Sequence, residues 1–426
     1  MNILIKKAKI IDPNSKHNNK IRDILIINGK IEKIASRIKK PISSKKITEI
    51  IEKNLHLSPG WFDMHVNFGE PGFEQRETIK TGSESAIKGG FTGVQIMPNT
   101  EPVLDNRGQI DSIFNKVRNN IIDIVPAGNI TKKQQGEEIT EMRDMFNGGC
   151  KAFTDDKKSL MRNDILTIAM LYTKDIDAVI MNFPNENYLA KDGKMHEGQI
   201  STELGIKGIP KIAEEIMIDR DLQISNYTKS RIHLSYISTS NGVQKIKQAK
   251  QQGLKVTADV ALHNLFLTDK SVNNFDTRYK VLPPLRERSD INMLLKSVKN
   301  GIIDVITSDH TPINKEEKKI EFENAAFGII GLETAFGLIG KHLTPYLTIE
   351  EIIKVISINP REILKLKKVV IDEKNNANLT LFNPELEWIF TKDDIRSKSK
   401  NSPFIGQTLK GKAIAIYNNG KFRRCK

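Results

Sequence analysis

The chain has 426 residues, of which 38% are hydrophobic, so it is long and apolar enough for a large barrel-type domain with an appendage, and wholesale disorder is excluded. Its 66 Lys and Arg against 52 Asp and Glu give a net charge of +14, but no basic stripe is interleaved with aromatic residues, which argues against nucleic-acid binding. Two cysteines exclude a disulfide framework and indicate a reducing cytoplasm, and no uncharged stretch of about 18 residues is present to span a membrane.

Both ends of the chain show short strand patterns. Residues 1–57 contain an Asn-Gly turn at Asn28-Gly29, and residues 367–426 contain a second one at Asn419-Gly420. We expect the two segments to form one composite β-domain.

The middle of the chain, residues 58–366, alternates strand and helix patterns. Eight strands separated by helices favour a (β/α)8 TIM-type barrel over an open sheet, and chemistry is then expected at the carboxyl ends of the strands. The predicted strands are 61–68, 91–97, 121–127, 150–154, 178–183, 231–238, 255–263 and 304–310.

Polar residues stand at several of these strand ends. His65 and Asn67 are two residues apart, so both are expected to face the barrel mouth. Asp155 and Asp156 follow the fourth strand, and Asp309 follows the eighth. A histidine and carboxylates converging on one mouth would form a nitrogen–oxygen metal site. The simpler alternative is that His65 is a hydrogen-bonded core residue.

Six motifs then occur in the order in which dihydroorotases of the amidohydrolase superfamily carry them. They are the long segment SPGWFDMHVNFGEPG…MPNTEPVLDN, followed by GGCKAFTDD, PPLRER, TSDHTP, FGIIGLETAFG and SINPREIL. The closing NSPFIGQTLKGKAIAIYNNGK also resembles the last strands of that family. The similarity covers nearly the whole chain.

The resemblance implies the reversible interconversion of dihydroorotate and N-carbamoyl-aspartate in pyrimidine biosynthesis. In the family one or two Zn²⁺ ions activate a water that attacks the ring carbonyl, and a carboxylate shuttles the proton. Residue-by-residue transfer retains His65, Asp155 and Asp309 as metal ligands, with Asp309 also the proton shuttle and Asn99 a substrate contact. Asp156 is the less favoured neighbour of Asp155, and Asn67 offers only a weak oxygen.

Several family positions are replaced in this chain. The first strand's second histidine and its arginine read Asn67 and Gly69, so the bidentate grip on the substrate carboxylate is missing. His233 lies three residues before the replaced histidine position at Tyr236, and strand alternation predicts that it faces away from the mouth. At most one Zn²⁺ is expected. The other replaced positions are Asn182, Leu282 and Ile313.

Two hypotheses remain open. The first is an active dihydroorotase with a one-metal site, in which Arg76, Arg286 or lysines replace the carboxylate grip. The second is a catalytically silent, dihydroorotase-like structural subunit that supports aspartate transcarbamoylase, as such relatives do. Another cyclic-amide hydrolase, a hydantoinase or allantoinase, is disfavoured because those sites rely on the missing histidines. A cytoplasmic homo-oligomer without nucleic-acid or membrane partners is expected in either case.

Overall fold

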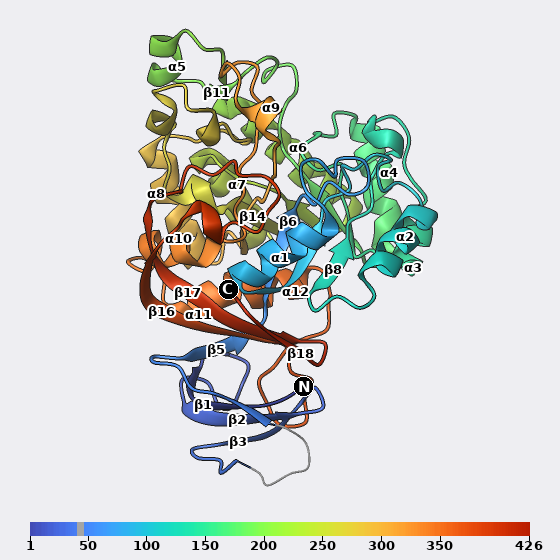
Figure 1. Ribbon diagram of the computed structural model, residues 1–426. Helices are drawn as coiled ribbons and strands as arrows, with labels where there is room; N and C mark the ends of the chain where they lie inside the picture. The colour runs from blue at the N-terminus through green and yellow to red at the C-terminus, as the bar shows by residue number, and fades with distance from the viewer. Residues whose placement is uncertain (41–46) are drawn as a thin grey trace.

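The computed structural model describes residues 1–40 and 47–426, so residues 41–46 of the predicted N-terminal β-segment lie outside the described residues. An α/β barrel forms the upper part of the molecule, and a β-sheet that contains both ends of the chain lies below it (Figure 1). The predicted fold class is therefore confirmed.

The sheet joins the two chain ends through adjacent strands. Its order is β18-β17-β16-β5-β1-β2-β3, with β4 beside β1. β5 pairs with β16 in antiparallel register, Leu57 opposite Leu381, and both side chains are fully buried. The strands are β1 (Asn2–Ile10), β2 (Ile21–Ile27), β3 (Lys30–Ala35), β4 (Ile47–Ile50), β5 (His56–Pro59), β16 (Leu379–Ile389), β17 (Thr408–Asn418) and β18 (Lys421–Arg424).

The barrel consists of two parallel sheets that close on each other. A three-stranded sheet, β6-β7-β8, and a five-stranded sheet, β9-β10-β13-β14-β15, meet at two parallel bridges, Val66 with His310 and Gly128 with Phe153. Each predicted strand segment contains one of these strands. They are β6 (Trp61–Val66), β7 (Phe91–Ile96), β8 (Asp123–Pro126), β9 (Ala152–Phe153), β10 (Val179–Asn182), β13 (Ile232–Leu234), β14 (Val256–Ala261) and β15 (Val305–Thr307).

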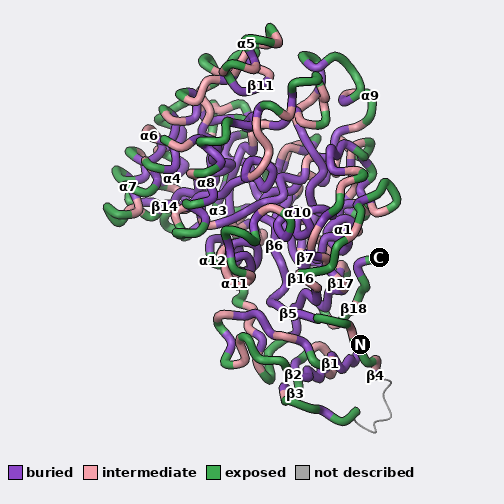
Figure 2. Tube along the Cα trace, turned by 90° about the vertical axis from the view of Figure 1, so that its left-hand side faces the viewer, coloured by how far each residue is buried: buried purple, intermediate pink, exposed green. Residues whose placement is uncertain are grey.

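Helices cover the outside of the barrel, and buried residues concentrate on its strands (Figure 2). The first helix begins after Thr78, whose hydroxyl accepts from the Thr81 N–H, and ends at Gly90 with φ 88°. The helices are α1 (Ile79–Gly89), α2 (Arg107–Val117), α3 (Met142–Asn147), α4 (Asn163–Lys174), α5 (Gln199–Leu204), α6 (Lys211–Thr228), α7 (Ser240–Gln251), α8 (Arg288–Lys299), α9 (Lys315–Lys318), α10 (Ala335–His342), α11 (Ile349–Ile353) and α12 (Asn359–Ile363). Two short strands, β11 (Met195–His196) and β12 (Gly208–Ile209), pair in the segment before α6.

None of the helices in residues 1–40 and 47–426 combines the length and the apolar character that crossing a bilayer requires.

Candidate active site

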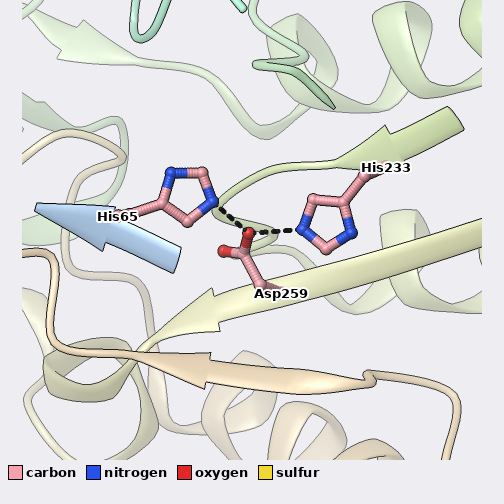
Figure 3. A group of neighbouring side chains, drawn as sticks. All are labelled: His65, His233 and Asp259. Atoms are coloured by element: carbon pink, nitrogen blue, oxygen red, sulfur yellow. Dashed lines mark hydrogen bonds and ion pairs between the residues drawn. The ribbon is translucent and has the colours of Figure 1, made fainter. Parts of the chain in front are cut away.

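Three buried side chains from three barrel strands meet at the barrel interior. His65 lies on β6, His233 on β13 and Asp259 on β14 (Figure 3). The two imidazole Nε2 atoms lie 2.6 Å and 2.7 Å from the same oxygen, Asp259 Oδ2. The second oxygen, Oδ1, accepts from the Tyr236 N–H at 2.8 Å. Asp259 therefore links β6, β13 and the turn after β13.

The predicted outward orientation of His233 is wrong. Strand β13 ends at Leu234, and Tyr236 has a φ of 59°, in the left-handed region. Strand alternation stops at that point, so residues three apart both reach the interior. The ring of Tyr236 lies with its centroid 4.3 Å from that of His65, while His233 bonds Asp259.

Attraction between opposite charges sets the direction of the pKa shifts of His65 and Asp259. Burial alone would lower the pKa of His65, but the adjacent Asp259 charge and hydrogen bond outweigh it, so the net shift is upward. Burial would likewise raise the pKa of Asp259, yet His65 and His233 hold it below its ordinary range. The cluster is a buried ion-pair network, in which His65 Nδ1 has no hydrogen-bond partner among the described residues.

Asp155 and Asp156 have different surroundings. Asp155 accepts hydrogen bonds from the backbone of Ile130 and Thr131, the Thr131 hydroxyl and the Asn129 amide, at 2.5–3.2 Å. Burial raises its pKa, against the effect of these donors. Asp156, with φ 52°, accepts from Asn99 Nδ2 at 2.9 Å and keeps one buried oxygen without a partner. The structure thus engages Asp155 in loop hydrogen bonds and gives Asp156, not the favoured Asp155, the contact with Asn99.

These surroundings predict that substitution of Asp155 lowers the free energy of unfolding more than substitution of Asp156 does. Asp155→Ala leaves several buried donors without an acceptor and should lower the free energy of unfolding by about 3 kcal/mol. Asp156→Asn removes a buried carboxyl whose pKa is raised by burial and should change the free energy of unfolding by less than about 1 kcal/mol. Urea denaturation of both variants measures the difference, and an equal loss in both would contradict this assignment.

Asp309 is neutralised by a lysine. Lys157 Nζ lies 2.7 Å from Asp309 Oδ1 and 2.9 Å from Oδ2, and 4.6 Å from the centroid of the Tyr236 ring. The Asp309 side chain is fully buried. His263 Nε2 lies 3.8 Å from Asp309 Oδ2, and burial lowers the pKa of His263 to about 4, so this imidazole is neutral. The Lys157 ammonium group is therefore the counter-charge of Asp309.

The amides at replaced histidine positions also have protein partners. Asn67 Nδ2 donates to the Thr311 hydroxyl at 3.3 Å, and Asn182 Nδ2 donates to Asp221 on α6 at 2.7 Å. Asn182 thereby contributes to the packing of α6 against the barrel.

The expected replacements for the substrate grip are engaged elsewhere. Gly69 has φ 64°, and a Cβ there would lie 2.8 Å from the Phe73 carbonyl oxygen, so this backbone excludes an arginine without rearrangement. Arg76 pairs with Glu317 at 2.5 Å. Arg286 is buried and donates to His196, the Ile209 carbonyl and Ser238. The replaced positions Leu282 and Ile313 are partly buried and buried apolar side chains, respectively.

The donor atoms determine whether the implied metal fits. Among the described residues, His65, His233 and Asp259 are the group of three whose ligand atoms lie within 4.8 Å of one another, and zinc accepts such donors. Both Nε2 atoms, however, already bond Asp259 Oδ2, and both oxygens of Asp309 bond Lys157. A divalent cation beside Asp309 would have to displace the Lys157 ammonium, although His65 Nδ1 and Asp156 Oδ1 are buried donor atoms without a partner among the described residues.

The site residues predicted from the sequence did not include Lys157, Asp259 or His263. Asp259 and His263 lie four residues apart in the predicted strand 255–263, so alternation along that strand was a signal that both face one side. A lysine that follows two aspartates carries no comparable signal, because only the fold brings Lys157 to Asp309.

Comparisons with known proteins agree with the fold. Residues 55–242 match the model of the Dihydro-orotase-like family. The L-hydantoinase of Arthrobacter aurescens superposes with a TM-score of 0.87 at 21% identity, covering 99% of this chain and 95% of that chain. The dihydropyrimidinase of Brevibacillus agri NCHU1002 gives 0.83 at 19% identity, with 99% and 95% covered.

Sequence relatives extend over the full length. The chain is 37% identical over 426 residues to the dihydroorotase of Syntrophus aciditrophicus (strain SB), covering 99% of each chain. It is 40% identical over 414 residues to the dihydroorotase of Thermoanaerobacter sp. (strain X514), covering 96% of this chain and 94% of the relative. These full-length similarities show that the chain belongs to the dihydroorotase family.

Proposed function

We propose that this chain is a catalytically silent member of the dihydroorotase family, which serves pyrimidine biosynthesis in the cytoplasm as a structural subunit. One observation carries the proposal: the Lys157 ammonium bonds both oxygens of Asp309, the carboxylate that the family resemblance assigns to metal binding and proton transfer.

The chemistry of ring opening supports this proposal. A metal beside Asp309 would have to displace a bidentate, mostly buried ammonium, and a carboxylate held by that ammonium is a weak proton acceptor. A substrate carboxylate also needs a cationic partner. Position 69 has no side chain, and the guanidinium groups of Arg76 and Arg286 are paired within the protein.

The test is dihydroorotate hydrolysis by the purified full chain, with and without added Zn²⁺. We expect no turnover above background, and the same background for Asp309→Ala. The Thermoanaerobacter relative, assayed in parallel, verifies the assay. Zinc-dependent turnover that Asp309→Ala abolishes would overturn the proposal.

A second candidate is favoured by the ligand atoms of His65, His233 and Asp259. In this case the chain would interconvert dihydroorotate and N-carbamoyl-aspartate with one Zn²⁺. The zinc content of the dialysed protein distinguishes the two functions. Catalytic zinc is held by three protein ligands, so this group of three would hold about one ion per chain. Substoichiometric zinc together with absent turnover would exclude this candidate.

The partner that the family resemblance implies for a silent subunit is aspartate transcarbamoylase. Co-elution of the full chain with that enzyme from the same cell, at micromolar concentration, measures the association. Two separate elution peaks would contradict the structural role even if the chain has no activity.

A further inference from the structure

A large cleft lies on the side of the barrel away from the candidate active site. It has a volume of about 1150 Å³ and is lined by the start of β8, by residues 366–370 and 374–378, and by the turns at residues 28–29 and 419–420. The strands β6, β7 and β8 begin on this side. The side chains of the candidate active site, in contrast, lie in the middle of the barrel strands or beyond their carboxyl ends. The cleft therefore lies between the base of the barrel and the β-sheet that contains the chain termini.

The two Asn-Gly turns of the sequence form one wall of this cleft. Both are two-residue hairpin loops with positive φ at each position, 49° and 84° at Asn28-Gly29 and 50° and 71° at Asn419-Gly420. A Cβ on Gly29 would lie 3.7 Å from the Gly420 Cα, so the turns lie against each other. Asn419 Nδ2 also donates to Asp123 at 3.1 Å. Contacts within the chain therefore position this wall.

The lining is strongly basic. Lys30, Lys367, Lys368 and Lys374 are exposed at the cleft, and Asp123 is its acidic side chain. Within residues 1–40 and 47–426, none of these four lysines forms an ion pair, although the nearby Lys365 pairs with Asp177 and Lys16 with Asp372. A concave cluster in which cations outnumber the carboxylates concentrates anions, because the surrounding low-dielectric walls focus its field.

One residue of the cleft lining is a buried arginine. Arg361 is 6% exposed, and its Nη2 donates to the Gly60 carbonyl at 3.2 Å and to the Thr92 hydroxyl at 3.1 Å. The buried Nε has no hydrogen-bond partner in the described structure. Burial lowers the pKa of Arg361 to about 10, so the group remains charged at neutral pH. The guanidinium carbon lies 5.2 Å from the centroid of the Phe62 ring, and the charge of Asp123 acts on the same group, so Arg361 adds a partly compensated positive charge to the lining.

We infer that this cleft binds the oligophosphate group of a small metabolite. The positive charge of Arg361 attracts one phosphate, and the rim lysines Lys367, Lys368 and Lys374 suit the others. The volume exceeds that of a single anion, and the asparagine side chains of the lining can hydrogen-bond the organic part. The inference does not depend on catalytic activity at the other end of the barrel.

Calorimetric titration of the full chain with tripolyphosphate and with ATP, without Mg²⁺ and at physiological salt, tests this site. We expect saturable binding of both at one molecule per chain. Lys368→Gln combined with Lys374→Gln should weaken both at least about tenfold, since two of the charges that attract the anion are removed. Both lysines are exposed, so the double variant should fold.

The matched control is Lys133→Gln combined with Lys299→Gln, which removes two exposed lysines outside the cleft and should leave both affinities unchanged. Arg361→Met is expected to abolish binding, provided that its circular dichroism is native. Absence of saturable binding of both probes would overturn the inference. An equal loss in the control double variant would also overturn it, because the binding would then reflect only the overall charge of +14. Neither result bears on the turnover and zinc measurements.

Discussion

Asp259→Ala is expected to lower the free energy of unfolding by about 3–5 kcal/mol, because it removes one partner of a buried charge network and leaves the others uncompensated. Its carboxylate accepts from both imidazoles and from the Tyr236 N–H, and its side chain is fully buried. Urea denaturation at pH 6, followed by circular dichroism, measures the loss.

Asp219→Ala is the control for this prediction. Asp219 pairs with Lys245 on the surface, where both side chains are substantially exposed, so its loss should change the free energy of unfolding by about 1 kcal/mol or less. Equal losses of unfolding free energy in the two variants would contradict the larger stabilisation that we assign to the buried network.

The same network predicts a pH dependence. The pKa of His65 is raised in the folded chain, so its stabilising contribution is complete below the ordinary histidine pKa of about 6.5 and is lost as the pH rises through the folded value. The difference in the free energy of unfolding between wild type and Asp259→Ala should therefore become smaller above neutral pH. A difference that widens with pH would show that His65 is not the charged partner.

Trp61→Ala is the second substitution with a large expected effect, a loss of about 3–5 kcal/mol in the free energy of unfolding. Trp61 opens β6 at the junction of barrel and sheet and is fully buried. Its ring stacks on Phe336 with centroids 4.5 Å apart, contacts Phe382 at 5.5 Å, and donates from Nε1 to the Ser58 hydroxyl at 3.0 Å. Truncation opens a cavity in a core shared by both parts of the molecule.

Trp388→Ala supplies the comparison, since the Trp388 ring is only partly buried and packs at the edge of the core. It should lose less free energy of unfolding than Trp61→Ala, with both measured by chemical denaturation. If Trp388→Ala lost as much, the junction at Trp61 would not be the tighter core.

At the barrel mouth, charged side chains pair with one another. Positive charge beside Asp309 comes from Lys157, and the histidines are paired through Asp259. These internal pairs satisfy charges that would otherwise be buried without compensation. Other buried polar atoms of the mouth, among them His65 Nδ1, Asp156 Oδ1 and the Tyr236 hydroxyl, have no hydrogen-bond partner among the described residues.

The arrangement of elements was predictable because it depends on local patterns. Alternating strand and helix signals indicated the eight barrel strands, and each predicted segment contains one of them. The Asn-Gly pairs marked the two hairpins, since both central residues need positive φ. The motifs from His65 to the closing strands indicated the family, and the full-length relatives show it.

The side-chain pairing at the mouth was decided only by the tertiary structure. Strand alternation placed His233 outside, but β13 stops at Leu234 and the left-handed turn at Tyr236 breaks the alternation. Similarly, the family resemblance favoured Asp155 over the adjacent Asp156, but in the fold the loop at residues 129–131 donates hydrogen bonds to Asp155. The sequence by itself determined the barrel, the terminal sheet and the family, because short-range periodicity and turn chemistry encode them. Which charges meet, such as Lys157 and Asp309 across 152 positions of the chain, depends on how strand ends curve and was settled only by the folded barrel.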